Sequence, residues 1–250
     1  DLNPKCKDAL INRAVAYEKL GDSKSSLGDY EQLLDLNGAN PEAHLAIATM
    51  YDKEKNYQKA VEHYLHALTL TKSDAPILYT IGIDYIKMND YKTAINYFSK
   101  CLITDKNYKD AYASRAYAYE KTGSDDKALA DYTKLLGIDP KNVNGYNSRA
   151  HLKMKKKDFR GAVADYTIAL TYAPRASDIY YNRGIAKYEL QDLAGAAKDF
   201  TKAISYKPDD SKLYFNKAVI EEQLNNTNNA IINYTKAIDF NPNCYQAYVA

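Results

Sequence analysis

The chain has 250 residues, 46% hydrophobic and 26% charged, which is enough for one large domain or two small ones. Its formal net charge of +2 is a balance of mixed signs, which gives no long-range field to attract nucleic acid or a membrane surface. No run of about 18 apolar residues occurs, so the sequence predicts no membrane insertion.

The three cysteines, Cys6, Cys101 and Cys244, are too few and too scattered for a disulfide framework. An odd count favours a reducing compartment such as the cytoplasm, although no targeting signal in the sequence identifies the compartment. Cys101 falls at a position where equivalent segments of the chain have leucine or alanine, so we expect it to be a small core residue.

A period of 34 residues runs along the chain. Seven copies, without insertion or deletion, occupy residues 7–40, 41–74, 75–108, 109–142, 143–176, 177–210 and 211–244, which we call repeats 1 to 7. With positions in a repeat numbered from 1 to 34, position 8 is Ala or Gly, position 20 is Ser or Ala, and position 24 is Tyr or Phe. Residues 1–6 match the end of a repeat and residues 245–250 the start of one, so we expect partial repeats there. We infer from this a single array over 1–250 that is a fragment of a longer protein.

Each repeat shows apolar residues at the spacings of two amphipathic helices, A and B, joined by a tight turn. Position 16 holds a residue whose side chain can cap helix B by accepting from its free backbone N–H groups. These residues are Asp22, Asn56, Asp90, Ser124, Asp158, Asp192 and Asn226. The predicted helices, in chain order, are 8–20, 23–36, 42–54, 57–70, 76–88, 91–104, 110–122, 125–138, 144–156, 159–172, 178–190, 193–206, 212–224 and 227–240.

Small residues at positions 8 and 20 let the two helices approach closely, and the ring at position 24 fills the space beside them. This period and pattern resemble the tetratricopeptide repeat (TPR). The resemblance implies an all-α fold, a right-handed superhelical α-solenoid of antiparallel helix pairs in which each repeat contacts mainly its neighbours.

Positions 7 and 23 vary together along the chain. Four repeats have Arg at position 7 and Asp at position 23. The other three have neither Arg at position 7 nor Asp at position 23. The pairs are Arg13 with Asp29, Arg115 with Asp131, Arg149 with Asp165, and Arg183 with Asp199. Covarying positions are usually spatial neighbours, so we predict structural ion pairs between helices A and B. If such a pair is partly buried, removing one partner is expected to cost about 3 kcal/mol, against well under ~1 kcal/mol for an exposed pair.

The search for catalytic chemistry is negative. The sequence has no Gly-rich phosphate loop and no H-E-x-x-H, C-x-x-C or G-x-S-x-G motif, so we predict neither an enzyme nor a cofactor, and no catalytic residue. His44, His63 and His66 all lie in repeat 2, with the last two on one helix face. A metal site would need a third ligand to converge there, so we favour a packing or surface role and predict no metal.

The resemblance implies that the A helices line the concave side of the array, with positions 2, 5, 6, 9, 12 and 13 facing the groove. The candidate groove residues are Asn12, Tyr79, Ser114, Tyr117, Asn147, Ser148, His151, Tyr181, Asn182, Phe215 and Asn216. Amides and hydroxyls that repeat along a groove can pair with the backbone of an extended peptide, and exposed rings offer apolar anchors. The alternative interpretation of this set is an ordinary polar helix surface.

The favoured function is a non-catalytic scaffold for protein–protein interaction, holding an extended or helical segment of a partner protein in the groove. The alternative is a self-assembly module, a homo-oligomer whose array ends stack on one another. RNA binding, as in the similar pentatricopeptide arrays, is disfavoured by the 34-residue period and the low net charge. A chaperone-tail clamp, found in some TPR proteins, is disfavoured because only Asn182 and Lys212 match its pattern.

Overall fold

The computed structural model describes residues 7–36, 38–71 and 74–242. These residues form fourteen α-helices and no strand. In chain order the helices are α1 (Lys7–Leu20), α2 (Ser23–Leu36), α3 (Pro41–Lys53), α4 (Tyr57–Thr71), α5 (Ala75–Lys87), α6 (Tyr91–Thr104), α7 (Lys109–Lys121), α8 (Asp125–Ile138), α9 (Val143–Lys155), α10 (Phe159–Tyr172), α11 (Ser177–Glu189), α12 (Leu193–Tyr206), α13 (Ser211–Gln223) and α14 (Thr227–Phe240). Every helix A begins at the first residue of its predicted repeat, and every helix B begins at position 17.

The starts of the B helices follow from the residues at position 16. Asp192 Oδ1 accepts from the backbone N–H of Gly195 at 2.9 Å, and Asp158 Oδ1 accepts in the same way from Gly161 at 2.9 Å. Asn226 makes no such cap, and its Nδ2 donates to Glu221 Oε2 at 2.9 Å. The residue before each capping position has a positive φ, which turns the chain sharply between the two helices.

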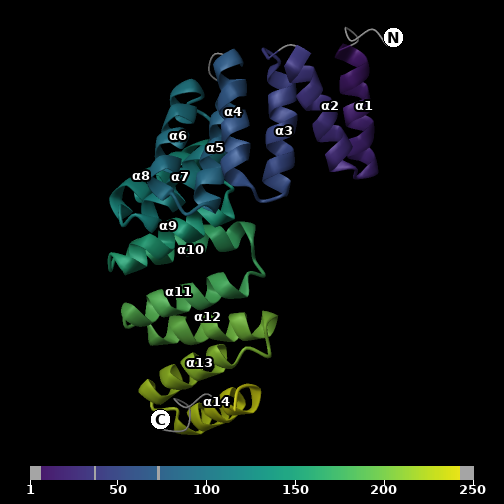
Figure 1. Ribbon diagram of the computed structural model, residues 1–250. Coiled ribbons are helices and arrows are strands. Elements are labelled where there is room, and N and C mark those ends of the chain that lie inside the picture. The colour runs from purple at the N-terminus through teal and green to yellow at the C-terminus, as the bar shows by residue number, and fades with distance from the viewer. Residues whose placement is uncertain (1–6, 37, 72–73, 243–250) are drawn as a thin grey trace. The chain divides into compact units, whose positions relative to one another are not determined.

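The chain forms two compact units, residues 1–131 and 132–250, with the boundary inside α8. From α1 to α7 in the first unit and from α9 to α14 in the second, each helix packs against the next one in the sequence, as α9 to α14 show in green and yellow (Figure 1). The A helices of neighbouring repeats also touch, α5 against α7 in the first unit and α9 against α11 in the second. The prediction of an all-α fold built from antiparallel helix pairs is therefore confirmed. The partial repeats predicted at 1–6 and 245–250 lie outside the described residues.

The core of each repeat lies between its two helices. Phe98 and Phe200, at position 24, are buried against glycines at position 8. A Cβ added to Gly82 would lie 2.5 Å from the Phe98 ring, and one added to Gly184 would lie 3.1 Å from the Phe200 ring. This close approach is the packing that small residues at position 8 were expected to allow. Cys101 is a free thiol with no exposed surface, and its burial raises its pKa to about 11.

Across the part of the chain that the structure describes, no helix combines the length and the apolar character needed to cross a membrane.

Candidate functional site

The A helices of the second unit carry a row of half-buried amide and aromatic side chains. Asn147 lies on α9, Tyr181 and Asn182 on α11, and Phe215 and Asn216 on α13. Positions 5 and 6 supply all of them, so the 34-residue period repeats the same pair of places on every helix A. We call these side chains the amide row.

Tyr181 links two repeats of this unit. Its ring packs against Phe200 of the same repeat, with 5.8 Å between ring centroids, and its hydroxyl hydrogen-bonds with Asn216 of the next repeat. Burial raises the pKa of the Tyr181 hydroxyl, and the hydrogen bond with Asn216 partly opposes that shift. Asn216 is held from its other side, because its Nδ2 donates to the backbone carbonyl of Lys212 at 2.8 Å.

The first unit contains the same arrangement at Tyr79. The Tyr79 ring lies 5.7 Å from Phe98, and its hydroxyl lies 3.4 Å from Ser114 Oγ in the next repeat. Tyr117, four-tenths exposed, stands edge-on to Tyr91 with 6.3 Å between centroids. Position 5 of one repeat and position 6 of the next therefore meet in both units.

The structure does not gather all the candidate groove residues. Asn12 and His151 are exposed, and Ser148 is half-buried. Among the described residues, none of these three forms a hydrogen bond or ring contact with another candidate. Asn147 is different, because its Oδ1 is enclosed yet has no hydrogen-bond partner within the described part of the chain.

A hollow of about 210 Å³ opens beside Tyr181 at the N-terminal ends of α11 and α13. Its lining residues are Ser177, Asp178, Tyr181, Lys207, Asp210, Lys212 and Leu213. The lining combines two basic and two acidic side chains with an aromatic ring, so it can hold a polar side chain of either charge. The sequence reasoning put position 2 on the groove side but did not select Asp178 and Lys212, which occupy that position in successive repeats.

The four Arg–Asp pairs lie in two-point contact. Arg149 Nε and Nη2 donate to Asp165 Oδ2 and Oδ1 at 2.8 and 2.7 Å, and the other three pairs repeat this geometry at 2.6–2.8 Å. The hydrogen bond to Asp165 raises the pKa of the Arg149 guanidinium. In repeats 5 and 6 the same carboxylates also accept from lysines, Lys153 on Asp165 at 2.7 Å and Lys187 on Asp199 at 2.8 Å.

Three of these arginines have a further partner that the sequence reasoning missed. The remaining guanidinium nitrogen donates to a hydroxyl at position 25 of the preceding repeat. These contacts are Arg115 to Ser99 at 3.0 Å, Arg149 to Thr133 at 3.1 Å and Arg183 to Thr167 at 3.1 Å. The signal was present, since a hydroxyl residue stands at position 25 in each repeat that precedes one of these arginines. The arginines thus tie repeats together and belong to the architecture.

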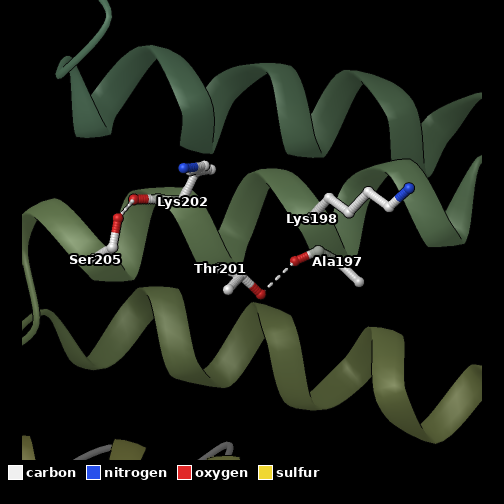
Figure 2. Close-up of a pocket in the computed structure, with 5 residues that line it drawn as sticks. All are labelled: Ala197, Lys198, Thr201, Lys202 and Ser205. Atoms are coloured by element: carbon white, nitrogen blue, oxygen red, sulfur yellow. Dashed lines mark hydrogen bonds between the residues drawn. The ribbon is translucent and has the colours of Figure 1, made fainter.

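A second hollow, of about 480 Å³, lies along α12 and is lined by Ala197, Lys198, Thr201, Lys202 and Ser205. Figure 2 shows Thr201 donating to the Ala197 carbonyl and Ser205 donating to the Lys202 carbonyl, at 2.8 and 2.7 Å. Thr201 stands at position 25, but the following repeat has Lys217 where an arginine would reach it. The only titratable side chains that line the hollow on α12 are Lys198 and Lys202, so this hollow offers neither an acid–base pair nor metal ligands.

The histidines of repeat 2 do come together, because His44 on α3 lies against His63 and His66 on α4. Even so, nowhere in the described ranges are three or more His, Cys, Asp or Glu side chains arranged to hold a metal ion.

The stacked helix pairs, the small–aromatic core and the 34-residue register define an α-solenoid built from helix-pair repeats. Family models for the tetratricopeptide repeat match residues 11–75, 79–143, 147–204 and 211–244. The chain therefore belongs to the tetratricopeptide repeat family. Repeats of this kind are typical of scaffolds that bind other proteins on an extended surface.

Solved structures show the same fold at low sequence identity. The C-terminal part of a TPR repeat-containing protein from Cytophaga hutchinsonii is 15% identical with a TM-score of 0.79, covering 99% of this chain and 98% of that one. A tetratricopeptide repeat protein from Parabacteroides merdae is 19% identical, with a TM-score of 0.66 and coverage of 97% and 96%. YrrB, described as a TPR protein with an unusual peptide-binding site, is 18% identical, with a TM-score of 0.68 and coverage of 76% and 97%. No curated protein matches the chain by sequence.

Proposed function

We propose that this chain is a non-catalytic scaffold whose amide row binds an extended segment of a partner protein. The observation that carries the proposal is the recurrence of Asn147, Asn182 and Asn216 on three successive A helices of one unit. An amide offers both donors and an acceptor, so a row of them can pair with a peptide backbone whatever its sequence.

Asn147 supports this proposal further. Its enclosed Oδ1 lacks a hydrogen-bond partner within the described residues, and an unpaired buried acceptor carries a free-energy cost. A rotation that presents this oxygen to a backbone N–H of a ligand would remove that cost. Asn147 therefore gains a hydrogen bond on binding rather than exchanging one.

The hollow beside Tyr181 supplies a place for one side chain of the bound segment. Tyr181 forms one wall, and Asp178 and Lys212 lie at the N-terminal ends of two successive A helices. A pocket with a fixed ring and charged groups selects among side chains, while the amides hold the backbone. The peptide-binding site named for YrrB, a protein of the same fold, is consistent with this kind of ligand.

The test is selection of random peptides displayed on phage against the purified chain, followed by affinity measurements on variants. Asn182→Ala and Asn216→Ala should each weaken a selected peptide about tenfold, the worth of one hydrogen bond of roughly 1.4 kcal/mol. Tyr181→Phe tests the hydroxyl while keeping the ring against Phe200, which Tyr181→Ala would not do.

The matched control is Thr201→Ala in the hollow on α12, which lies on a B helix. It should leave peptide affinity unchanged. The proposal fails if the three variants of the amide row bind as well as the wild type, or if Thr201→Ala weakens binding equally.

Self-assembly is the second candidate, and one observation favours it. On α14, Ile231 and Ile232 are 58% and 53% exposed, a high value for adjacent aliphatic side chains. If this surface joins two copies, Ile232→Lys should abolish concentration-dependent sedimentation. The same variant leaves peptide binding intact if the amide row is the site.

A further inference from the structure

In repeat 2 histidines lie between helix A and helix B, where repeats 1, 4, 5 and 6 have an Arg–Asp pair. At positions 7 and 23 it has Ile47 and His63. His63 on α4 faces His44 on α3, with 3.1 Å between their Nδ1 atoms. His66 on α4 stacks on His44, with 5.0 Å between the two ring centroids and 19° between the ring planes. We call these three side chains the histidine cluster.

The contact between the two Nδ1 atoms constrains the proton count. A hydrogen bond between two imidazoles needs one N–H and one bare nitrogen, so at least one ring must be neutral. If both nitrogens carried protons, two positively charged rings would point N–H groups at each other across 3.1 Å. The third imidazole, stacked on His44, would add to the repulsion if it were charged as well.

The surroundings of the cluster offer little compensation for a second positive charge. His44 is only 9% exposed, and α3 packs against α2 through apolar side chains such as Leu33 and Leu34. On α4, Glu62 favours a charged His63 whereas Lys59 opposes it, and Tyr51 of α3 places a neutral ring 5.8 Å from His63. The backbone of Gly38 acts on His44 in the opposite direction from burial and favours its charged form.

We propose that the histidine cluster makes the contact between α3 and α4 sensitive to acid. The cluster stabilises this contact near neutral pH and weakens it when the cluster takes up a second proton. Repeats 4, 5 and 6 have an Arg–Asp pair at the equivalent place and no histidine there. Repeat 2 is thus the member of the array in which acidification separates helix A from helix B.

The direction of the pH effect follows from the environment of the rings. Burial lowers the pKa of both His44 and His63 below the ordinary value, and the neighbouring imidazoles lower it further. The unfolded chain, with histidines near a pKa of about 6.5, then binds more protons than the folded chain does. The stability of repeat 2 is complete above about pH 6.5 and declines as the pH falls through the lowered pKa values.

The test uses amide hydrogen exchange of the whole chain at about pH 7.5 and about pH 5.5, corrected for the intrinsic pH dependence of exchange. Each unit of pKa depression corresponds to a tenfold change in opening. We expect α3 and α4 to lose protection by about tenfold on acidification, relative to α9 and α10, which an Arg–Asp pair joins. Equal losses in the two helix pairs would overturn the proposal.

A variant makes the same test independently. His63→Gln keeps a donor and an acceptor beside His44 but cannot take up a proton, so the acid-induced loss in α3 and α4 should shrink toward that of α9 and α10. His151→Gln is the matched control, because His151 is exposed on α9 and belongs to no cluster. An acid-induced loss that is the same in wild type and in His63→Gln would contradict the proposal.

Discussion

In repeats 5 and 6 an Arg–Asp ion pair joins helix A to helix B. In repeats 2 and 3 aliphatic and ring side chains make the contact at the same positions. In repeat 6, Asp199 accepts from both Arg183 and Lys187. In repeat 3 the corresponding positions hold Ile81, which is fully buried, and Tyr97, which stacks on Tyr85 with 5.4 Å between centroids. The same backbone therefore accepts two different chemistries at one place.

The difference shows what an Arg–Asp pair contributes beyond the contact between helix A and helix B of one repeat. A buried ion pair is a weak source of stability compared with apolar packing, since both ions lose water. Arg149 and Arg183, however, also donate to the preceding repeat, so their guanidinium groups fix one helix pair against the next. An isoleucine at the same position packs well but has no directional bond to offer the neighbouring repeat.

Repeat 3 carries its buried charge elsewhere. Asp84 has no exposed surface, although position 10 is apolar in all six other repeats. Its Oδ1 accepts from Lys87 at 3.1 Å, and Lys87 also donates to Asp52 of repeat 2. Desolvation raises the pKa of Asp84 to about 6, and Lys87 only partly offsets that effect.

The largest effect on stability is expected from removing one partner of a buried ion pair between helix A and helix B. Asp165→Leu leaves Arg149, only 17% exposed, and Lys153 without their carboxylate. We expect it to lower the free energy of unfolding by about 3 kcal/mol, because an uncompensated buried charge is costly. Denaturant unfolding at neutral pH measures the loss.

The double variant Arg149→Met with Asp165→Leu removes both charges of the pair and provides the control. It should be less damaging than Asp165→Leu alone, since positions 7 and 23 then carry no charge, as in repeat 3 with Ile81 and Tyr97. Additive losses in this cycle would show that the two side chains do not interact.

The next effect has the opposite sign. Asp84→Leu restores the apolar residue typical of position 10, and we expect it to stabilise the chain by about 2 kcal/mol at pH 7. The folded pKa is raised above the ordinary value of 3.8, so the contribution of Asp84 to stability is complete below about pH 4 and is lost as the pH rises through about 6. The advantage of the variant should therefore shrink as the solution is acidified.

Unfolding free energies at about pH 7 and about pH 4.5 measure this prediction. Asp110→Leu is the control for the substitution itself, because Asp110 is exposed on α7 and its replacement removes no buried carboxylate. A constant difference between Asp84→Leu and wild type at both pH values would contradict the expected titration of Asp84.

Much of the fold was predictable because it depends on short spacings within one repeat. The capping aspartates set the starts of the B helices, and the small residue at position 8 with the ring at position 24 sets the core of each pair. The small residue and the ring recur in all seven repeats, and aspartate stands at the capping position in four of them, so each signal is read several times. The Arg–Asp contacts were accessible for the same reason, as two positions that change together.

The remaining features depend on side-chain directions that the spacing does not determine. His44 on α3 meets His63 on α4, although neither residue follows the pattern of the other repeats, and Lys87 reaches Asp52 across a boundary between repeats. The candidate groove residues were chosen through family resemblance, and the spacing did not show that position 5 of one repeat meets position 6 of the next, as in Tyr79 with Ser114. Their role in binding remains a prediction until the amide row is tested.

The smallest effect concerns the turns between helices A and B, where glycine occupies the positive-φ position in two repeats and larger residues occupy it in the other five. Gly21 and Gly123 in the first unit have φ of 77° and 74°, whereas Gln191 in the second unit is held at 62° by the same turn. A residue with a Cβ is strained by about 1 kcal/mol in this left-handed conformation, which glycine adopts freely.

Gln191 is exposed, so little packing is lost on replacing it. Gln191→Gly should therefore raise the free energy of unfolding by about 0.5 kcal/mol, after allowing for the greater freedom of glycine in the unfolded chain. The converse change, Gly123→Gln, should lower it by about 1 kcal/mol. Denaturant midpoints that move the same way for both variants would show that the positive φ is not the source of the difference.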